Sequence, residues 1–181
     1  MIRAVFLDRD GVINRQFERA SRGFAPRTLE EFEILPGVKE TITRLKAKGF
    51  LVIVVTNQPD VATGKTAREV VEAMHEKLRS ELAVDDIYVC YHTDAENCDC
   101  RKPKSGMLRA AARDWGIKLE QSFMVGDRWR DIEAGKDVGC KTVFVDSGYG
   151  EPRPTGPDAV VSSLAEAGPV IFGRGNARTE V

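Results

Sequence analysis

Short apolar runs, each bounded by polar residues, recur along most of the chain and are separated by longer amphipathic stretches. A short continuous apolar run of this kind is typical of a buried strand. The runs predict strands at residues 2–7, 51–55, 87–91, 122–125 and 141–145, and a weaker sixth strand at 159–161.

Helical periodicity fills the intervals between these runs. Val38, Ile42 and Leu45, for example, recur at the spacing that gives a helix one apolar face. Proline near the start of such a stretch and glycine just after its end are usual boundary residues of helices. Together these signals predict helices over about 37–48, 66–82, 105–115 and 129–138.

Strands that are apolar throughout and alternate with helices predict an α/β fold. The expected architecture is a three-layer, Rossmann-like parallel sheet with helices on both faces and no large cap domain. At 181 residues the chain has the length of one domain, which we place at 1–172, followed by a disordered tail at 173–181. The long polar connection 14–35 is expected to form a lid or a substrate loop.

Composition and charge exclude several classes of protein. Hydrophobic residues make up 42% of the chain and charged residues 30%, which argues against wholesale disorder. The 27 Lys and Arg against 28 Asp and Glu give a net charge of −1, with no general attraction to nucleic acid or anionic membranes. The N-terminus lacks the apolar region of a signal peptide, and no apolar window is long enough to cross a membrane. We therefore expect a cytoplasmic protein without nucleic-acid or membrane partners, and a monomer because no heptad repeat is present.

Acidic residues follow two of the predicted strands. Asp8 and Asp10 come directly after the first strand and Asp127 after the fourth. Ligands of parallel sheets bind beyond the carboxyl ends of the strands, so these carboxylates should share one site. Their mutual repulsion calls for a cation, and Mg²⁺ prefers oxygen ligands while leaving positions for a phosphate. One Asp is then available as a nucleophile and another as general acid and base, although an isolated D-x-D more often only ends a strand.

Two further residues suit phosphate chemistry. Thr56, at the end of the second strand, offers a hydroxyl and Lys102 a positive charge to the oxygens of a transferring phosphoryl group. The sequence Gly64-Lys65-Thr66 stands where a nucleotide-binding P-loop would lie. That loop requires a glycine at the position of Pro59, so we interpret the segment as an ordinary loop.

Three of the four cysteines lie close together along the chain. Cys90-x-His92 and Cys98-x-Cys100 supply three thiolates and an imidazole, the closed tetrahedral set of a structural zinc site. Such a site would clamp the loop that precedes Lys102. The alternative is a buried Cys90 with two incidental loop cysteines. Cys140 is interpreted as a core residue.

Four segments, taken together, resemble the motifs of the haloacid dehalogenase superfamily of phosphatases. They are D-R-D-G-V at 8–12, T-N-Q at 56–58, R-K-P at 101–103 and G-D-R-W-R-D at 126–131, and the resemblance covers about residues 2–165. It implies that Asp8 forms an aspartyl-phosphate and that Asp10 protonates the leaving alcohol and later activates water. It also implies that Thr56 and Lys102 hold the phosphoryl group, while Asp8, Asp127 and the Asp10 carbonyl bind Mg²⁺. Asp131 would orient the site or cap the following helix.

The cysteine-containing segment is similar to the zinc-carrying branch of that superfamily, subclass IIIA, which includes heptose bisphosphate and histidinol phosphate phosphatases. The resemblance implies removal of the 7-phosphate of D-glycero-D-manno-heptose 1,7-bisphosphate, with histidinol phosphate as the alternative substrate. Arg101 would contact the second phosphate or the sugar. The remaining substrate contacts would come from Asn57, Gln58, Arg128 and loop residues near 16–19.

The chain also departs from the heptose enzymes. Pro59-Asp60 replaces their Ser-Gly, and Thr63 stands where they carry an arginine. Arg19, Arg22 or Lys65 could replace the lost charge. Two other function classes stay open: a polynucleotide 3′-phosphatase, which should show a basic stripe, and a non-catalytic zinc-binding scaffold.

Overall fold

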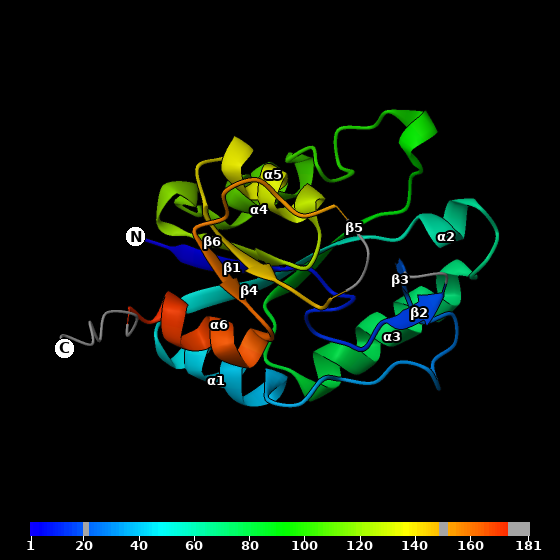
Figure 1. The fold of residues 1–181 in the computed structure, drawn as a ribbon, viewed down its shortest axis with the longest axis horizontal. Helices are drawn as coiled ribbons and strands as arrows, with labels where there is room; N and C mark the ends of the chain where they lie inside the picture. Colours follow the sequence, from blue (N-terminus) through cyan, green and yellow to red (C-terminus); the bar gives the residue numbers. More distant parts are fainter. Residues whose placement is uncertain (20–21, 149–151, 174–181) are drawn as a thin grey trace.

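The computed structural model describes residues 1–19, 22–148 and 152–173, and within them six strands form one parallel sheet (Figure 1). The strand order is β5-β4-β1-β6-β7-β8, with every neighbouring pair parallel. The strands are β1 (Arg3–Leu7), β4 (Phe50–Asn57), β5 (Asp86–Cys90), β6 (Phe123–Gly126), β7 (Lys141–Val145) and β8 (Ala159–Val161).

Helices cover both faces of this sheet, as predicted. On one face lie α1 (Val38–Ala47), α3 (Arg68–Glu81) and α6 (Leu164–Ile171), and on the other lie α4 (Gly106–Trp115) and α5 (Trp129–Asp137). Alternate residues of β1 enter the two apolar layers: Val5 and Leu7 join the first, Ala4 and Phe6 the second. Because both layers are apolar, the strands contain few polar residues until they reach their carboxyl ends.

The predicted strands and helices are present with ends shifted by a few residues, and the α/β fold class is confirmed. The prediction missed α6, whose sequence contains Gly168 and Pro169, both weak helix formers. Burial of Leu164, Ala167 and Ile171 against α1 stabilises this helix, and the Ser163 Oγ accepts a hydrogen bond from the Glu166 amide at its start. Tertiary packing therefore outweighs local propensity here.

The polar connection 14–35 contains a two-stranded hairpin that was not predicted, β2 (Phe17–Arg19) and β3 (Arg22–Phe24). Other short elements that were missed are α2 (Pro59–Ala62), η1 (Asp94–Glu96) and η2 (Leu119–Gln121). Whether the hairpin segment moves as a lid stays a prediction, as does the single domain at 1–172. Of the predicted tail, 174–181 lie outside the described residues.

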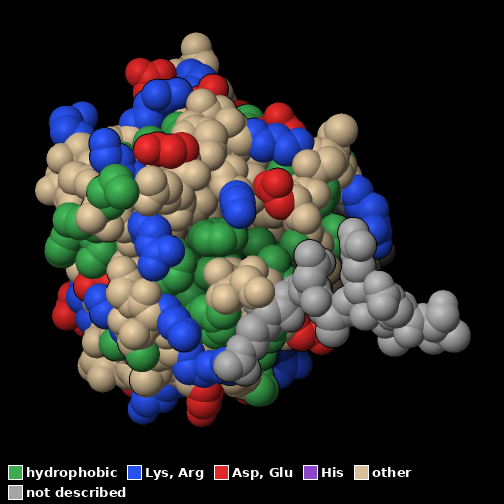
Figure 2. Space-filling view, turned by 90° about the vertical axis from the view of Figure 1, so that its left-hand side faces the viewer, with side chains coloured by type: hydrophobic (Ala, Val, Ile, Leu, Met, Phe, Trp, Pro, Cys, Tyr) green, Lys and Arg blue, Asp and Glu red, His purple; other side chains and the backbone are tan. Residues whose placement is uncertain are grey.

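The amino ends of the strands form the face shown in Figure 2, where hydrophobic side chains gather in a hollow with Lys and Arg around it. At this end of the sheet the Arg3 guanidinium lies 4.4 Å from the centre of the Phe50 ring, and Lys141 Nζ lies 5.8 Å from that of Phe123. In the described residues no helix is both long and apolar enough to span a membrane. The acidic residues singled out from the sequence lie at the opposite, carboxyl edge.

Candidate active site

A cavity of about 440 Å³ opens at the carboxyl edge of the sheet. Its walls come from the ends of β1, β4 and β6, from the loop after β5 and from the hairpin. The predicted site residues that line it are Asp8, Asp10, Asn57, Gln58, Arg101, Lys102 and Arg128. Thr56 is buried beside it, where its Oγ1 accepts a hydrogen bond of 2.9 Å from Gln58 Nε2.

Lys102 is buried between two carboxylates. Its Nζ lies 2.9 Å from Asp8 Oδ1 and 2.6 Å from Asp131 Oδ1, and it donates a hydrogen bond of 2.8 Å to the Val55 carbonyl. Burial disfavours the charged lysine, but the two carboxylates outweigh it and raise the pKa of Lys102. Burial and the neighbouring Asp131 raise the pKa of Asp8 to about 6 despite Lys102. The ammonium group is therefore shared by two acids and neutralises neither fully.

Asp8, Asp127 and Asp131 form an acidic cluster whose oxygens lie within 4.8 Å of one another. Burial and the Asp8 carboxylate raise the pKa of Asp127 well above its usual value. Asp127 Oδ1 is buried and has no hydrogen-bond partner among the described residues. Surplus negative charge and an unpartnered oxygen are what a hard divalent cation would satisfy, so this donor set fits Mg²⁺.

Asp10 lies in a different environment, surrounded by hydrogen-bond donors. Arg9 contacts both of its oxygens, at 2.9 and 3.1 Å, while Asn14 and Gln58 donate hydrogen bonds of 3.0 and 2.7 Å. Burial opposes ionisation, but the charge of Arg9 and these hydrogen bonds outweigh it and lower the pKa of Asp10. Two carboxylates two positions apart therefore have pKa values displaced in opposite directions.

Arg9 links this site to helix α3, a connection that the sequence did not predict. Its side chain is completely buried, and Nη1 lies 3.1 Å from His75 Nε2. Burial and the adjacent guanidinium lower the pKa of His75 to about 4, so the ring is neutral and accepts the hydrogen bond. In the sequence, the only sign of this contact is Arg9 itself, a charged residue between Asp8 and Asp10 at the end of a buried strand.

Asn57 holds the loop that carries Lys102 through two hydrogen bonds to its backbone. Its side-chain amide donates a hydrogen bond of 3.1 Å to the Lys102 carbonyl and accepts one of 3.2 Å from the Lys102 amide. Arg128 is similarly engaged, donating a hydrogen bond of 2.6 Å from Nη2 to the Gly23 carbonyl of the hairpin. Asp131 contacts Lys102 and also accepts a hydrogen bond from the Arg128 amide at the start of α5, so it caps the helix, while its role in orienting the site stays a prediction.

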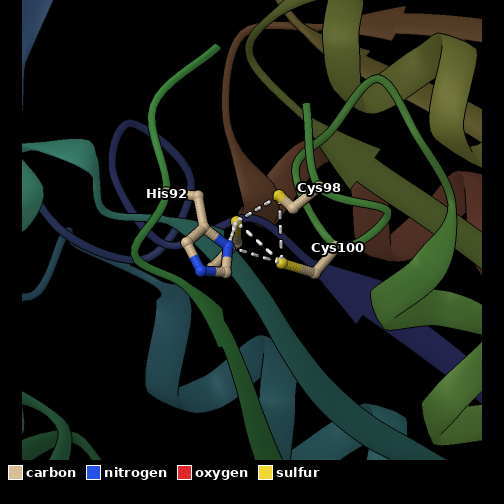
Figure 3. Close-up of side chains that lie close together, drawn as sticks. His92, Cys98 and Cys100 are labelled. Atoms are coloured by element: carbon tan, nitrogen blue, oxygen red, sulfur yellow. Dashed lines mark hydrogen bonds between the residues drawn. The ribbon is translucent and has the colours of Figure 1, made fainter. Parts of the chain in front are cut away.

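Cys90, His92, Cys98 and Cys100 converge beside this cavity, and Figure 3 shows the last three pointing toward one another. The Sγ–Sγ distances are 3.6 Å for Cys90 and Cys98, 3.3 Å for Cys98 and Cys100, and 2.9 Å for Cys90 and Cys100, and His92 Nδ1 lies 3.4 Å from Cys100 Sγ. Tetrahedral zinc with bonds of about 2.0–2.3 Å would place its ligand atoms roughly 3.5–3.8 Å apart. Most of the observed distances are somewhat shorter than this, but the four donor atoms converge on one point and the three thiols are free, so the donor set of three sulfurs and one ring nitrogen fits zinc. Cys140 is buried in the core, as expected.

A second unpredicted residue, Arg130, lies at the rim of the cavity. Asp94 Oδ1 is 2.8 Å from Arg101 Nε and 2.8 Å from Arg130 Nη1. Hydrogen bonds from both guanidinium groups lower the pKa of Asp94 to about 2. One carboxylate thus holds two arginines side by side, and both line the cavity.

Comparison with known proteins identifies the family. Residues 99–167 match the HAD-hydrolase-like family model. A relative from Pseudomonas putida, D-glycero-beta-D-manno-heptose-1,7-bisphosphate 7-phosphatase, is 42% identical over 155 residues, covering 83% of this chain and 86% of the relative. The chain belongs to the haloacid dehalogenase phosphatases. It is therefore a phosphoric monoester hydrolase, as the resemblance of its motifs predicted.

Other members of the family agree over nearly the whole chain. A Pasteurella multocida relative of the same name is 35% identical over 187 residues, covering 96% of this chain and 98% of its own. The crystal structure of D,D-heptose 1,7-bisphosphate phosphatase from B. bronchiseptica, complexed with magnesium and phosphate, superposes with a TM-score of 0.79 at 29% identity. The superposition covers 96% of this chain and 100% of that one.

Three basic residues were expected to supply the charge of the arginine that the heptose enzymes carry at the position of Thr63, namely Arg19, Arg22 or Lys65. Lys65 Nζ lies 4.0 Å from Asp60 Oδ1, and Lys65 is not among the described residues that line the cavity. The side chains of Arg19 and Arg22 lie outside the described part of the structure. Arg130, which the sequence analysis did not select, is the additional basic residue that reaches the cavity.

The buried His75 predicts a specific loss of acid stability. Its pKa is about 4 in the folded protein and near 6.5 when unfolded, so the unfolded chain takes up the proton first as pH falls. The stability that neutral His75 contributes is complete above pH 6.5 and is lost as pH falls toward 4. His75→Gln keeps an acceptor for Arg9 without titrating. Relative to this variant, the wild type should lose about 2–3 kcal/mol of unfolding free energy between pH 7 and 4.5, measured by urea denaturation. A difference that does not change with pH would contradict this account.

Proposed function

We propose that this phosphatase removes the 7-phosphate of D-glycero-D-manno-heptose 1,7-bisphosphate through an aspartyl-phosphate on Asp8. The observation that carries the proposal is the distribution of charge in the cavity. Buried carboxylates and the buried Lys102 line it together with three less buried arginines, Arg101, Arg128 and Arg130. A substrate with a second phosphate suits such a cavity. The names of the Pseudomonas and Pasteurella relatives support the same substrate.

The arginines favour this substrate over histidinol phosphate. Histidinol phosphate carries one phosphate and a cationic amine, and an amine would be repelled by guanidinium groups. A bisphosphate instead presents a dianion to each end of the cavity. Arg101 and Arg130, held together on Asp94, are the residues we assign to the second phosphate, with Asn57, Gln58 and Arg128 as further substrate contacts.

The chemical step follows from the two carboxylates. An Asp8 oxygen attacks phosphorus as the bond from phosphorus to the sugar O7 breaks, and Asp10 gives a proton to the departing oxygen. Asp10 then takes a proton from the water that attacks the aspartyl-phosphate, releasing inorganic phosphate and restoring Asp8. Thr56 and Lys102 hold the transferring oxygens in place. Both carboxylates line the same cavity at the carboxyl edge of the sheet, which supports their action on one phosphoryl group.

We assign a Mg²⁺ site to Asp8, Asp127 and the Asp10 carbonyl. The cation would supply positive charge to the acidic cluster and to the phosphoryl oxygens, and would favour the ionised form of Asp8 that the attack requires. The surplus charge of the cluster and the unpartnered Asp127 Oδ1 support this assignment. The magnesium and phosphate bound by the B. bronchiseptica enzyme support it further.

We assign a structural zinc ion to Cys90, His92, Cys98 and Cys100. Four protein ligands leave no open position for catalysis. The His92 carbonyl accepts a hydrogen bond of 3.2 Å from Arg101 Nη1, so fixing the loop also fixes Arg101. Cytoplasmic localisation, the monomeric state and the absence of nucleic-acid or membrane partners stay predictions of the sequence.

Replacement of the nucleophile tests the function. Asp8→Asn should reduce phosphate release from heptose 1,7-bisphosphate by about 10³-fold or more, because an amide cannot form the aspartyl-phosphate. The circular dichroism spectrum should be unchanged. Asp114→Asn, at a partly exposed aspartate of α4, is the matched control. Retained turnover in Asp8→Asn would rule out the mechanism, and a higher kcat/KM for histidinol phosphate would rule out the substrate.

The zinc assignment predicts different outcomes for two cysteines. Cys98→Ser should lower the zinc content of the purified protein from about one ion per chain and should lower its melting temperature, because a thiolate ligand is lost. Cys140→Ser should retain the zinc, since Cys140 lies in the core. Metal analysis by mass spectrometry measures both. Equal zinc contents in the two variants would contradict the assignment.

The role of Arg130 predicts a selective effect on the bisphosphate. Arg130→Met should raise KM for heptose 1,7-bisphosphate by roughly tenfold, as expected for one lost charge-assisted hydrogen bond, and should leave kcat nearly unchanged. KM for heptose 7-phosphate, which lacks the second phosphate, should not change. Arg113→Met, on the exposed surface of α4, is the control. A parallel rise in KM for both substrates would contradict the assignment.

A further inference from the structure

Gln16 makes two contacts that the proposed reaction does not explain. Its Nε2 donates a hydrogen bond of 2.7 Å to the Asp10 carbonyl and a very short one to Asp127 Oδ2. The sequence analysis placed Gln16 among the substrate contacts. In the structure it instead lines a separate cavity with Asp127. Both of its acceptors belong to residues that we assign to Mg²⁺.

The local backbone is arranged to bring this amide close to the site. A Cβ at Gly11 would collide with Gln16 Nε2 and would lie 2.8 Å from Asp127 Cγ. Gly11 also has a φ of +86°, a conformation that favours glycine. The absence of a side chain at this position therefore gives the Gln16 amide its path between Asp10 and Asp127.

The other end of the amide is unsatisfied. Gln16 is only 5% exposed, and its Oε1 is a buried oxygen with no hydrogen-bond partner in the described residues. Asp127 Oδ1 has the same status. Leaving a buried acceptor unpaired costs about 1–3 kcal/mol, so each of these two oxygens calls for a hydrogen-bond donor or a cation that the described residues do not supply.

The position of the amide also matches the spacing of metal ligands. Adjacent ligands of an octahedral Mg²⁺ ion with bonds of 2.0–2.1 Å lie roughly 2.9 Å apart. The 2.7 Å separation of Gln16 Nε2 and the Asp10 carbonyl oxygen is close to this value. Because the nitrogen and oxygen of an amide have nearly the same shape, a half-turn of the group would put Oε1 at the same position.

We propose that Gln16 is an additional metal-binding residue of this phosphatase. In the cation-free protein its N–H group bridges the Asp10 carbonyl and the Asp127 carboxylate and partly offsets their negative charge. When the cation binds, the amide turns and Oε1 becomes a ligand. The adjoining cavity of about 180 Å³, lined in part by Gln16 and Asp127, gives room for this turn and for water molecules on the cation.

Isothermal titration of Mg²⁺ into the full-length, cation-free protein, without substrate, tests this proposal. Gln16→Ala should weaken Mg²⁺ binding by about five- to tenfold, and Gln121→Ala, at a glutamine remote from the site, should not. Gln16→Glu should bind Mg²⁺ more tightly than the wild type. Its melting temperature without cation should be lower, because a carboxylate replaces the bridging N–H donor.

The outcomes separate a ligand from a simple competitor. Unchanged or tighter Mg²⁺ binding by Gln16→Ala would overturn the proposal. If the Gln16 amide only blocked the cation site, its removal would make Mg²⁺ bind more tightly. If Gln16→Ala does not fold, Gln16→Glu decides, and binding no tighter than the wild type would overturn the proposal.

The inference rests on the cation site proposed above, which Asp127→Asn tests separately. If that variant binds Mg²⁺ as the wild type does, the cation site itself is wrong. If it loses Mg²⁺ while the Gln16 variants do not change, only the role of Gln16 is wrong.

Discussion

The buried ammonium group of Lys102 is the interaction on which the geometry of the site depends. It lies between Asp8 and Asp131 with almost no exposure to water, and removing one partner of such a buried ion pair costs about 3–5 kcal/mol. Asp8 follows β1, Asp131 belongs to α5, and Lys102 follows β5 in the chain. A single charge therefore joins three parts of the fold, and displacement of Lys102 would leave two buried carboxylates without their counter-ion.

Lys102 can occupy this position only if its loop is held from outside the sheet. The Asn57 side chain pairs with the Lys102 backbone, and Cys100 of the Cys/His cluster lies two residues before Lys102 in the chain. Arg101, the preceding residue, contacts Asp94 and the His92 carbonyl. The same loop thus positions Lys102 beside Asp8 and Arg101 at the rim of the cavity. The proposed site for the second phosphate is in this way linked to the Cys/His cluster.

The sequence predicted the parts of the protein that repeat a simple pattern. Apolar runs located the strands, and the ends of those strands located Asp8, Asp10, Thr56 and Asp127 because parallel strands present their carboxyl ends at one edge. It could not predict contacts between segments that are remote in the chain. The pairing of Arg9 with His75 and of Arg130 with Asp94 depends on how helices and loops pack, and no local signal marks either pair. Helix α6 was missed because its packing against α1 overcomes an unfavourable composition.

The opposite pKa displacements of Asp8 and Asp10 connect these networks to the reaction. Without a cation, Asp8 holds its proton more tightly than usual and Asp10 less tightly, the reverse of what the proposed roles of nucleophile and general acid need. A cation beside Asp8 lowers its pKa, and a phosphate dianion beside Asp10 raises that of Asp10. Binding of both would therefore exchange the two protonation preferences.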